Sequence, residues 1–237
     1  MSAPKIIGFI GLGQMGEPMC SFIAKGDTPV ICYDRVSGLA PAGSQEAASL
    51  SEVISTADTI FMSLPDGKIV NTVASQIAGL DGVKGKVIID MSTIGPAAAK
   101  EAASAITGAG MTYINAPVSG GRQGALKAKI TIIWSGSKSE MERHQAILDL
   151  FSNNTFHVGD TPGQGQAVKL LNNFLSATAM AASSEAVLFG LAHGVEMKTI
   201  IDVVKVSTGN NTAIADKFPN RILPGTFDAG FFAELLN

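Results

Sequence analysis

Near its start the chain reads Lys5-Ile6-Ile7-Gly8-Phe9-Ile10-Gly11-Leu12-Gly13-Gln14-Met15-Gly16, a short apolar run followed directly by three spaced glycines. The apolar run predicts a buried β-strand over residues 5–10, and the residues behind it predict a helix over 14–25. In such a unit the first glycine permits a tight turn, the second lets backbone approach a pyrophosphate, and the third packs helix against strand. Because the helix N-terminus also faces the phosphates, the motif indicates a dinucleotide-binding turn.

An acidic residue supports this interpretation. Asp34 follows the predicted strand at 30–33, about 20 residues after the glycines, where a carboxylate can accept hydrogen bonds from both ribose hydroxyls. Asp34 would repel a 2′-phosphate, which favours NAD, whereas Arg35 could pair with one or simply stack, solvated, over the adenine. We therefore expect NAD as cofactor, with NADP as the alternative. The residues expected to contact it here are Gly11, Leu12, Gly13, Gln14, Met15, Gly16, Asp34 and Arg35.

Short β-rich runs alternate with helical stretches through the first two-thirds of the chain. Alternation of this kind predicts a Rossmann-type α/β fold, a doubly wound and mostly parallel sheet. The predicted strands are residues 5–10, 30–33, 59–64, 87–90, 112–115, 130–134 and 155–158. The predicted helices are residues 14–25, 44–56, 67–77, 96–107 and 139–150, the last with a capping box from Ser139 to Glu142.

The strand signals stop at a turn over residues 159–163, and from Gln164 onward the pattern is helical. Breaks are expected near Gly194, near Gly209 and over 219–224. We therefore predict a dinucleotide-binding domain over residues 1–162 and an all-α part over 163–237, opened by a long helix.

The composition excludes several other classes of protein. Of the 237 residues 46% are hydrophobic and 16% charged, which indicates a folded, core-rich chain, and a net charge of −3 gives no basic surface for nucleic acid. Cys20 and Cys32 are expected as reduced, buried core thiols. The N-terminus does not resemble a signal peptide. Residues 174–195 are long enough for a membrane span, but polar residues interrupt them, so we expect a buried helix of a soluble, cytoplasmic protein without membrane partners.

One lysine stands out on the predicted long helix. Lys169, Asn172 and Asn173 are three and four positions apart and therefore project from one face, with Ser176 one turn further. Burying a lysine costs free energy unless it is paired or its pKa falls. A lysine with a lowered pKa can serve as a general acid or base.

Three loops are further candidates. Leu64-Pro65 and Ser92-Thr93 lie at the ends of predicted strands, and ligands of such sheets bind beyond the carboxyl ends of the strands. A proline turn would explain Leu64-Pro65 nearly as well, and a helix N-cap would explain Ser92-Thr93 nearly as well. Ser119-Gly120-Gly121 could direct a hydroxyl and backbone N–H groups at a carboxylate, although a plain β-turn uses the same residues.

The histidines and tyrosines argue against other chemistries. His144, His157 and His193 lack metal-ligand spacing, and we expect surface or strand-end residues without a carboxylate partner. No metal site is predicted. Neither tyrosine is followed by lysine at the fourth position, which weighs against a short-chain dehydrogenase mechanism.

Three ordered motifs together resemble the β-hydroxyacid dehydrogenase family: residues 11–16, residues 115–121, and the run Gly163-x-Gly165-x-x-x-Lys169-x-x-Asn172-Asn173. The resemblance covers nearly the whole chain. It implies NAD-dependent oxidation of a small, 3-hydroxyisobutyrate-like β-hydroxy acid by hydride transfer, in a homodimer or homotetramer formed through the helical domain. It implies that Lys169 is the general acid/base, that Thr93 contacts the cofactor, and that the substrate is bound by Ser119, Gly120, Gly121 and Asn173.

The chain departs from the family pattern in two places. Ala128 and Lys129 replace the usual glycine and small polar residue, and the chain ends at Asn237, where relatives place a Lys-Asp pair and continue. We therefore expect a C-terminal domain that is incomplete relative to the family. The alternatives are an imine reductase, whose catalytic position usually carries another residue than lysine, and a dinucleotide-binding module without turnover.

Overall fold

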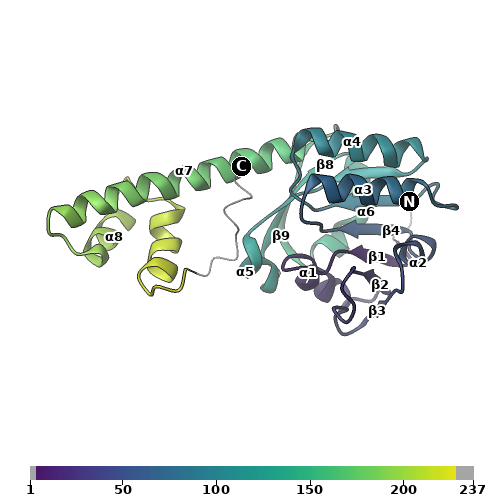
Figure 1. Cartoon of the computed structure of the whole chain (residues 1–237), viewed down its shortest axis with the longest axis horizontal. Helices are drawn as coiled ribbons and strands as arrows, with labels where there is room; N and C mark the ends of the chain where they lie inside the picture. Colours follow the sequence, from purple (N-terminus) through teal and green to yellow (C-terminus); the bar gives the residue numbers. More distant parts are fainter. Residues whose placement is uncertain (1–3, 228–237) are drawn as a thin grey trace. The chain divides into compact units, whose positions relative to one another are not determined.

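The computed structural model describes residues 4–227 and divides the chain into two compact units, with the division between Lys169 and Leu170. The first unit holds a single sheet flanked by helices on both faces (Figure 1). The second unit consists of helices. Residues 228–237 of the predicted all-α part lie outside the described residues.

The sheet has the order β3-β2-β1-β4-β5-β6-β8-β7, with β9 beside β8. Strands β3 to β6 along this order are parallel, β8 is antiparallel to β6 and β7, and β9 is parallel to β8. This mostly parallel sheet confirms the predicted fold class. The strands are β1 Ile7–Ile10, β2 Val30–Tyr33, β3 Ser44–Glu46, β4 Thr59–Met62, β5 Val87–Asp90, β6 Thr112–Asn115, β7 Val118–Ser119, β8 Ile130–Ser135 and β9 Ser152–Gly159.

Two hydrophobic cores lie on the two faces of the sheet. Because successive side chains of a strand point to opposite faces, Phe9 joins one core and Ile10 the other. Helices α1, α5 and α6 cover the face of Phe9, and α2, α3 and α4 cover the face of Ile10. Cys20 and Cys32 are buried free thiols, as predicted. The helices are α1 Gly16–Ile23, α2 Leu50–Thr56, α3 Gly67–Ala78, α4 Gly95–Gly108, α5 Gly121–Leu126 and α6 Lys138–Leu148.

Two helix starts differ from the prediction. The helix expected from residue 44 begins only at Leu50, because Ser49 caps it by accepting a hydrogen bond from Glu52 N at 3.2 Å, and the residues before it form the edge strand β3. The helix expected from Ser139 is instead capped by Ser137, whose hydroxyl accepts from Glu140 N at 3.3 Å. The predicted cap was therefore wrong by two residues.

The second unit contains most of α7 Gln164–Ala192, then α8 Met197–Lys205 and the π-helix η1 Ala213–Ile222. The breaks expected near Gly194 and Gly209 are confirmed. The break expected over 219–224 is also confirmed, because η1 ends at Ile222, although Pro219 itself lies inside η1, whose i→i+5 pattern continues to a bond from Leu223 N to Phe218 O. A small core holds this unit together, formed by Val187, Ile201, Ala213, Ile214 and Phe218.

Helix α7 is mostly exposed, which contradicts the expectation of a buried helix. Phe174 and Phe189 are each 69% exposed within the described residues. By length and composition α7 is also the one described helix that could cross a membrane, and only 11% of its most apolar window is buried. Its apolar face is therefore not covered by the part of the chain that the structure describes.

Candidate active site

The three glycines of the first turn have three distinct surroundings. Gly11 has φ +92°, and a Cβ there would overlap the carbonyl oxygen of Ser63. A Cβ at Gly16 would overlap the carbonyl oxygen of Gly11, so this position sets the close approach of α1 to the turn. No atom lies within 4 Å of a Cβ built on Gly13, which leaves open space beside its backbone. The turn therefore fits a pyrophosphate approaching at Gly13 and the N-terminus of α1.

Asp34 joins the end of β2 to this turn. Its Oδ2 accepts a hydrogen bond from Leu12 N at 2.7 Å, and its Oδ1 accepts one from Val36 N at 2.9 Å. Each carboxylate oxygen keeps lone-pair capacity for a ribose hydroxyl. Asp34 is half-buried, whereas Arg35 is exposed. Around the turn, Leu12 is buried, Gln14 is exposed and Met15 packs against the core.

The loops after β4 and β5 are joined through Ser92. Its hydroxyl accepts a hydrogen bond from Leu64 N at 2.9 Å, which brings Leu64 and the segment containing Thr93 to the same edge of the sheet as the glycine turn. Leu64 and Thr93 are half-buried, and Pro65 is exposed.

A buried carboxyl beneath this loop was missed by the sequence analysis. Asp90 ends β5, is fully buried, and accepts hydrogen bonds from Tyr113 Oη at 2.7 Å and from Ser92 N at 3.0 Å. Burial raises the pKa of Asp90, and burial together with Asp90 raises the pKa of Tyr113. The sequence signal that could have identified this buried carboxyl was an acidic residue at the end of an otherwise apolar strand, just before Ser92.

The first turn of α7 docks onto the first unit through a glycine. Gly165 N donates to Ser135 Oγ at 3.1 Å, and that hydroxyl donates to Asn115 O at 3.1 Å. A Cβ at Gly165 would lie 2.7 Å from Ile133 O. Only glycine therefore lets the helix approach β6 and β8 this closely, which explains its place in the motif.

Lys169 lies one turn after Gly165, on the same face of α7 and still within the first unit. It is half-buried, and desolvation lowers the pKa of its ammonium. Among the described residues no carboxylate forms an ion pair with it. A desolvated amine without a counter-ion is driven toward its neutral form, which is the form that can accept a proton.

The remaining candidates fall in both units. Ser119 pairs with Thr131 between β7 and β8, and the exposed Gly120 and Gly121 after it have φ +129° and +62° as α5 begins. Asn173 is half-buried on the part of α7 that belongs to the second unit. In that unit Ser176 Oγ, expected on the stripe of Lys169, accepts a hydrogen bond from Lys217 Nζ at 2.8 Å.

The expected surface position is confirmed for His193, which is exposed, but the expectation was wrong for the burial of His144 and for the carboxylate neighbours of His144 and His157. His144 is fully buried, with Nδ1 2.7 Å from Glu140 O and Nε2 2.9 Å from Thr59 Oγ1, and Glu140 Oε2 lies 3.5 Å from Nδ1. His157 Nε2 lies 3.3 Å from Asp160 Oδ1. Burial lowers the pKa of His144. Both side chains therefore have a carboxylate nearby, and neither belongs to the loops described above.

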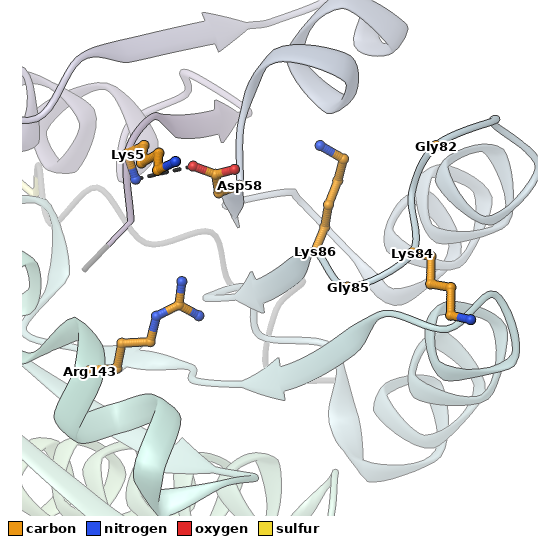
Figure 2. Close-up of a pocket in the computed structure, with 7 residues that line it drawn as sticks. All are labelled: Lys5, Asp58, Gly82, Lys84, Gly85, Lys86 and Arg143. Carbon is orange, nitrogen blue, oxygen red and sulfur yellow. Dashed lines mark hydrogen bonds between the residues drawn. The ribbon is translucent and has the colours of Figure 1, made fainter. Parts of the chain in front are cut away.

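A cavity of about 260 Å³ lies at the opposite edge of the sheet (Figure 2). All but one of its lining residues come just before β1, β4 and β5, and Arg143 comes from α6, so the cavity opens at the amino ends of the strands and is not the dinucleotide site. Lys86 Nζ donates to Ala57 O at 2.7 Å, and Arg143 pairs with Glu140 at 3.1 Å. The lining residues are Lys5, Asp58, Gly82, Lys84, Gly85, Lys86 and Arg143.

Comparison with known proteins assigns the family. Residues 6–159 match the family model described as the NAD binding domain of 6-phosphogluconate dehydrogenase. Residues 163–237 match the model described as NAD-binding of NADP-dependent 3-hydroxyisobutyrate dehydrogenase. The chain is 36% identical over 235 residues to 2-(hydroxymethyl)glutarate dehydrogenase of Eubacterium barkeri, and the alignment covers 97% of this chain and 78% of the relative.

Solved structures agree. The 3-hydroxyisobutyrate dehydrogenase of Mycobacterium tuberculosis, solved with L-serine, superposes with a TM-score of 0.85 at 30% identity, over 93% of this chain and 76% of that chain. An imine reductase of Streptomyces aurantiacus has a TM-score of 0.78 at 24% identity, over 93% of this chain and 78% of the other; it shows the shared fold alone.

Together, the glycine turn and these matches place the chain in the class of NAD(P)-dependent oxidoreductases. Within that class the chain belongs to the β-hydroxyacid dehydrogenase family, because three relatives that are at least 30% identical and aligned over nearly its whole length are dehydrogenases of that type. Its cofactor is therefore NAD or NADP.

Proposed function

We propose that this enzyme oxidises the hydroxyl group of a small β-hydroxy acid and that Lys169 is its general base. The observation that carries the proposal is the half-buried amine of Lys169 one turn into α7, which has no carboxylate ion pair among the described residues and whose pKa is lowered by desolvation. The names of the relatives support the same substrate class, since they include a 2-(hydroxymethyl)glutarate dehydrogenase and a 3-hydroxyisobutyrate dehydrogenase.

The proposed chemistry needs one proton and one hydride to leave the substrate. Nζ of neutral Lys169 takes the proton of the substrate hydroxyl and becomes an ammonium. The C–H bond of the carbon that bears this hydroxyl breaks, and a carbonyl forms there. The bound oxidised nicotinamide supplies the hydride acceptor. In the reverse direction, the ammonium of Lys169 returns the proton to the carbonyl oxygen.

Substrate orientation is assigned to the turn after β7 and to α7. In this proposal the hydroxyl of Ser119 and the backbone of Gly120 and Gly121 hold the substrate carboxylate, and Asn173 holds the substrate beside Lys169. The exposed, left-handed backbone of the two glycines supports the assignment, because backbone N–H groups in such turns can converge on an anion.

We propose NAD as the preferred cofactor. Asp34 supports this choice because its carboxylate, fixed by two backbone N–H groups, would repel a 2′-phosphate. Thr93, Leu64 and Pro65 are assigned to the nicotinamide end. Comparing kcat/KM for NAD and NADP tests the choice: we expect NAD to be preferred in the wild type, and an equal or higher value with NADP would overturn it.

NADH formation with a panel of hydroxy acids tests the substrate class. The panel contains 2-(hydroxymethyl)glutarate, 3-hydroxyisobutyrate and L-serine, with a cyclic imine plus NADPH as the contrasting reaction. We expect oxidation of at least one hydroxy acid, its loss in Lys169→Ala with NAD binding retained, and normal rates in Lys198→Ala, an exposed control. Turnover of the imine alone, or of no compound, would contradict the proposal.

We also propose that the apolar surface of the second unit is covered by another copy of this chain. Soluble monomers rarely expose large contiguous apolar patches, and closed symmetric oligomers are their commonest cover. Ser183, Ser184 and Glu185 interrupt the apolar run, which argues for a protein partner instead of lipid. The most exposed apolar residues of α7 and of α8 with its C-cap are Leu171, Phe174, Leu175, Leu188, Phe189, Val203 and Val206.

Light scattering coupled to gel filtration tests this assembly. We expect the mass of a dimer or tetramer, and dissociation in Leu188→Glu but not in Thr199→Glu, a substitution of an exposed polar residue on α8. A monomeric wild type, or co-sedimentation with phosphatidylcholine vesicles, would refute the proposal. If the protein is monomeric and does not sediment with vesicles, the oligomer proposal fails, while the expectation of a cytoplasmic protein remains.

A further inference from the structure

Gln166 is a buried polar side chain with no role in the chemistry above. It lies on the first turn of α7, and its side chain is completely buried. Its Oε1 accepts hydrogen bonds from Ile94 N at 3.0 Å and Gly95 N at 3.2 Å, and its Nε2 donates to Ser92 O at 2.8 Å. A single amide therefore makes three hydrogen bonds to the backbone of one loop.

These bonds take the place of a helix cap. Helix α4 starts at Gly95, and the side chain at its N-cap position, Ile94, cannot accept a hydrogen bond. The first N–H groups of a helix need acceptors from outside the helix, and burying them without one costs free energy. Gln166 supplies that acceptor from a position more than 70 residues later in the chain. Its burial is thereby explained by a specific set of partners.

The loop held by Gln166 contains Thr93, and the turn that carries Gln166 leads to Lys169. Residues three apart on a helix lie on the same face, so Gln166 and Lys169 share the face that docks onto the first unit. Ser92 also holds the loop to Leu64 through its hydroxyl. Gln166 is thus the hydrogen-bonded link between the loop assigned to the cofactor and the turn assigned to the base.

We infer that Gln166 is a positioning residue that fixes the distance between the Thr93 loop and Lys169. The inference rests on the proposed roles of Thr93 and Lys169. The hydride leaves the substrate carbon that bears the hydroxyl group, and the proton leaves that hydroxyl. The base and the cofactor loop must therefore keep a fixed distance and orientation to each other. Misplacement of reacting groups by about 1 Å can cost about 10²-fold in rate.

Two variants of Gln166 separate positioning from general damage. Gln166→Met keeps the length and removes all three hydrogen bonds, and we expect kcat to fall about 10²-fold with a smaller change in NAD affinity. Gln166→Glu offers, when protonated, one donor and one carbonyl acceptor in nearly the same places. Its activity relative to wild type should therefore recover as pH falls, whereas the ratio for Gln166→Met should not change with pH.

The matched control is Gln164→Met, on the same turn but exposed, whose side chain accepts a local hydrogen bond from Thr161 N at 2.9 Å. We expect near-normal kcat. Wild-type kcat in Gln166→Met, or a ratio for Gln166→Glu that stays flat with pH, would overturn the inference. If Gln166→Met does not fold, the Gln166→Glu ratio decides. Full activity in Lys169→Ala would instead overturn the proposed function, so the two failures are distinguishable.

Discussion

The two compact units of this chain bury their apolar residues to very different extents. In the first unit β1, β4 and β5 are buried along their whole length, and cores fill both faces of the sheet. In the second unit the core is small, and phenylalanines on α7 are 69% exposed. The first unit therefore has the packing of an independently stable fold, whereas the second has an apolar surface that the described residues leave uncovered.

The largest effect should come from comparing two phenylalanines. Phe61 on β4 is fully buried between Phe9 and Phe151, whereas Phe189 on α7 is exposed. We expect Phe61→Ala to lower the free energy of unfolding by about 3–5 kcal/mol, and Phe189→Ala to change that of the dilute, dissociated chain by less than about 0.5 kcal/mol. Urea unfolding measures both. Equal losses would show that both units are packed alike.

Alanine substitution of two glycines on α7 should also have different effects on stability and on activity. A Cβ at Gly165 would press on the carbonyl oxygen of Ile133, whereas at Gly190 it would meet the movable Cδ1 end of Ile200. We expect Gly165→Ala to cost about 1–3 kcal/mol and to lower kcat, because the turn carrying Lys169 must shift. Gly190→Ala should change stability by less than about 1 kcal/mol, since alanine also favours the helix. Thermal unfolding and NADH formation measure these effects, and the reverse order would contradict the docking of the first turn.

A smaller effect should appear on acidification. Thr59, Glu140 and Arg143 surround His144, and burial lowers its pKa below the ordinary 6.5, so the folded state holds fewer protons than the unfolded state. The stability contributed by neutral His144 is complete above pH 6.5 and is lost as pH falls toward the folded pKa.

Urea midpoints at about pH 7.5 and about pH 5.5 measure this loss. We expect His144→Gln to flatten the pH dependence and His193→Gln, a change of an exposed residue in the second unit, to leave it unchanged. An unchanged slope in His144→Gln would remove the histidine from the explanation.

The smallest effect concerns one strained residue of the first unit. Ala128 has φ +53°, at the position where the family resemblance led us to expect glycine. Left-handed backbone costs alanine free energy, whereas glycine loses more conformational entropy on folding. The two effects partly cancel, so Ala128→Gly should stabilise the folded protein by only about 0.5 kcal/mol. Ala99→Gly, inside α4, should instead destabilise by about 1 kcal/mol. Thermal unfolding of the pair measures both, and destabilisation by Ala128→Gly would contradict the strain.

Local patterns were enough to predict most of the first unit. The ends of β2, β5 and β6 were predicted to the residue, because apolar runs between turn residues depend on little else. Edge strand β3 was missed, since Ser44–Glu46 is polar and becomes a strand only by pairing with β2. His144 was misplaced for a similar reason: its partner Thr59 is 85 residues away in sequence.

At the candidate site, too, the sequence predicts local motifs but not contacts between residues that are distant in the chain. The glycine turn, Asp34 and Lys169 have local motifs and could be proposed from the sequence. The bonds of Gln166 could not, because its three partners lie in a loop more than 70 residues earlier. The exposure of α7 was also beyond pattern reading, since an apolar helix looks the same whether its own chain or another molecule covers it.

The pH dependence of kcat/KM for the best hydroxy acid tests the role of Lys169 most directly. Because desolvation lowers the pKa of Lys169 from 10.5, the rate should rise with pH through an apparent pKa clearly below 10.5 and then level off as the amine becomes neutral. The residual rate of Lys169→Ala should lack this rise. A rise of the same midpoint and height in Lys169→Ala would contradict the assignment, because the proton would then be taken by another group.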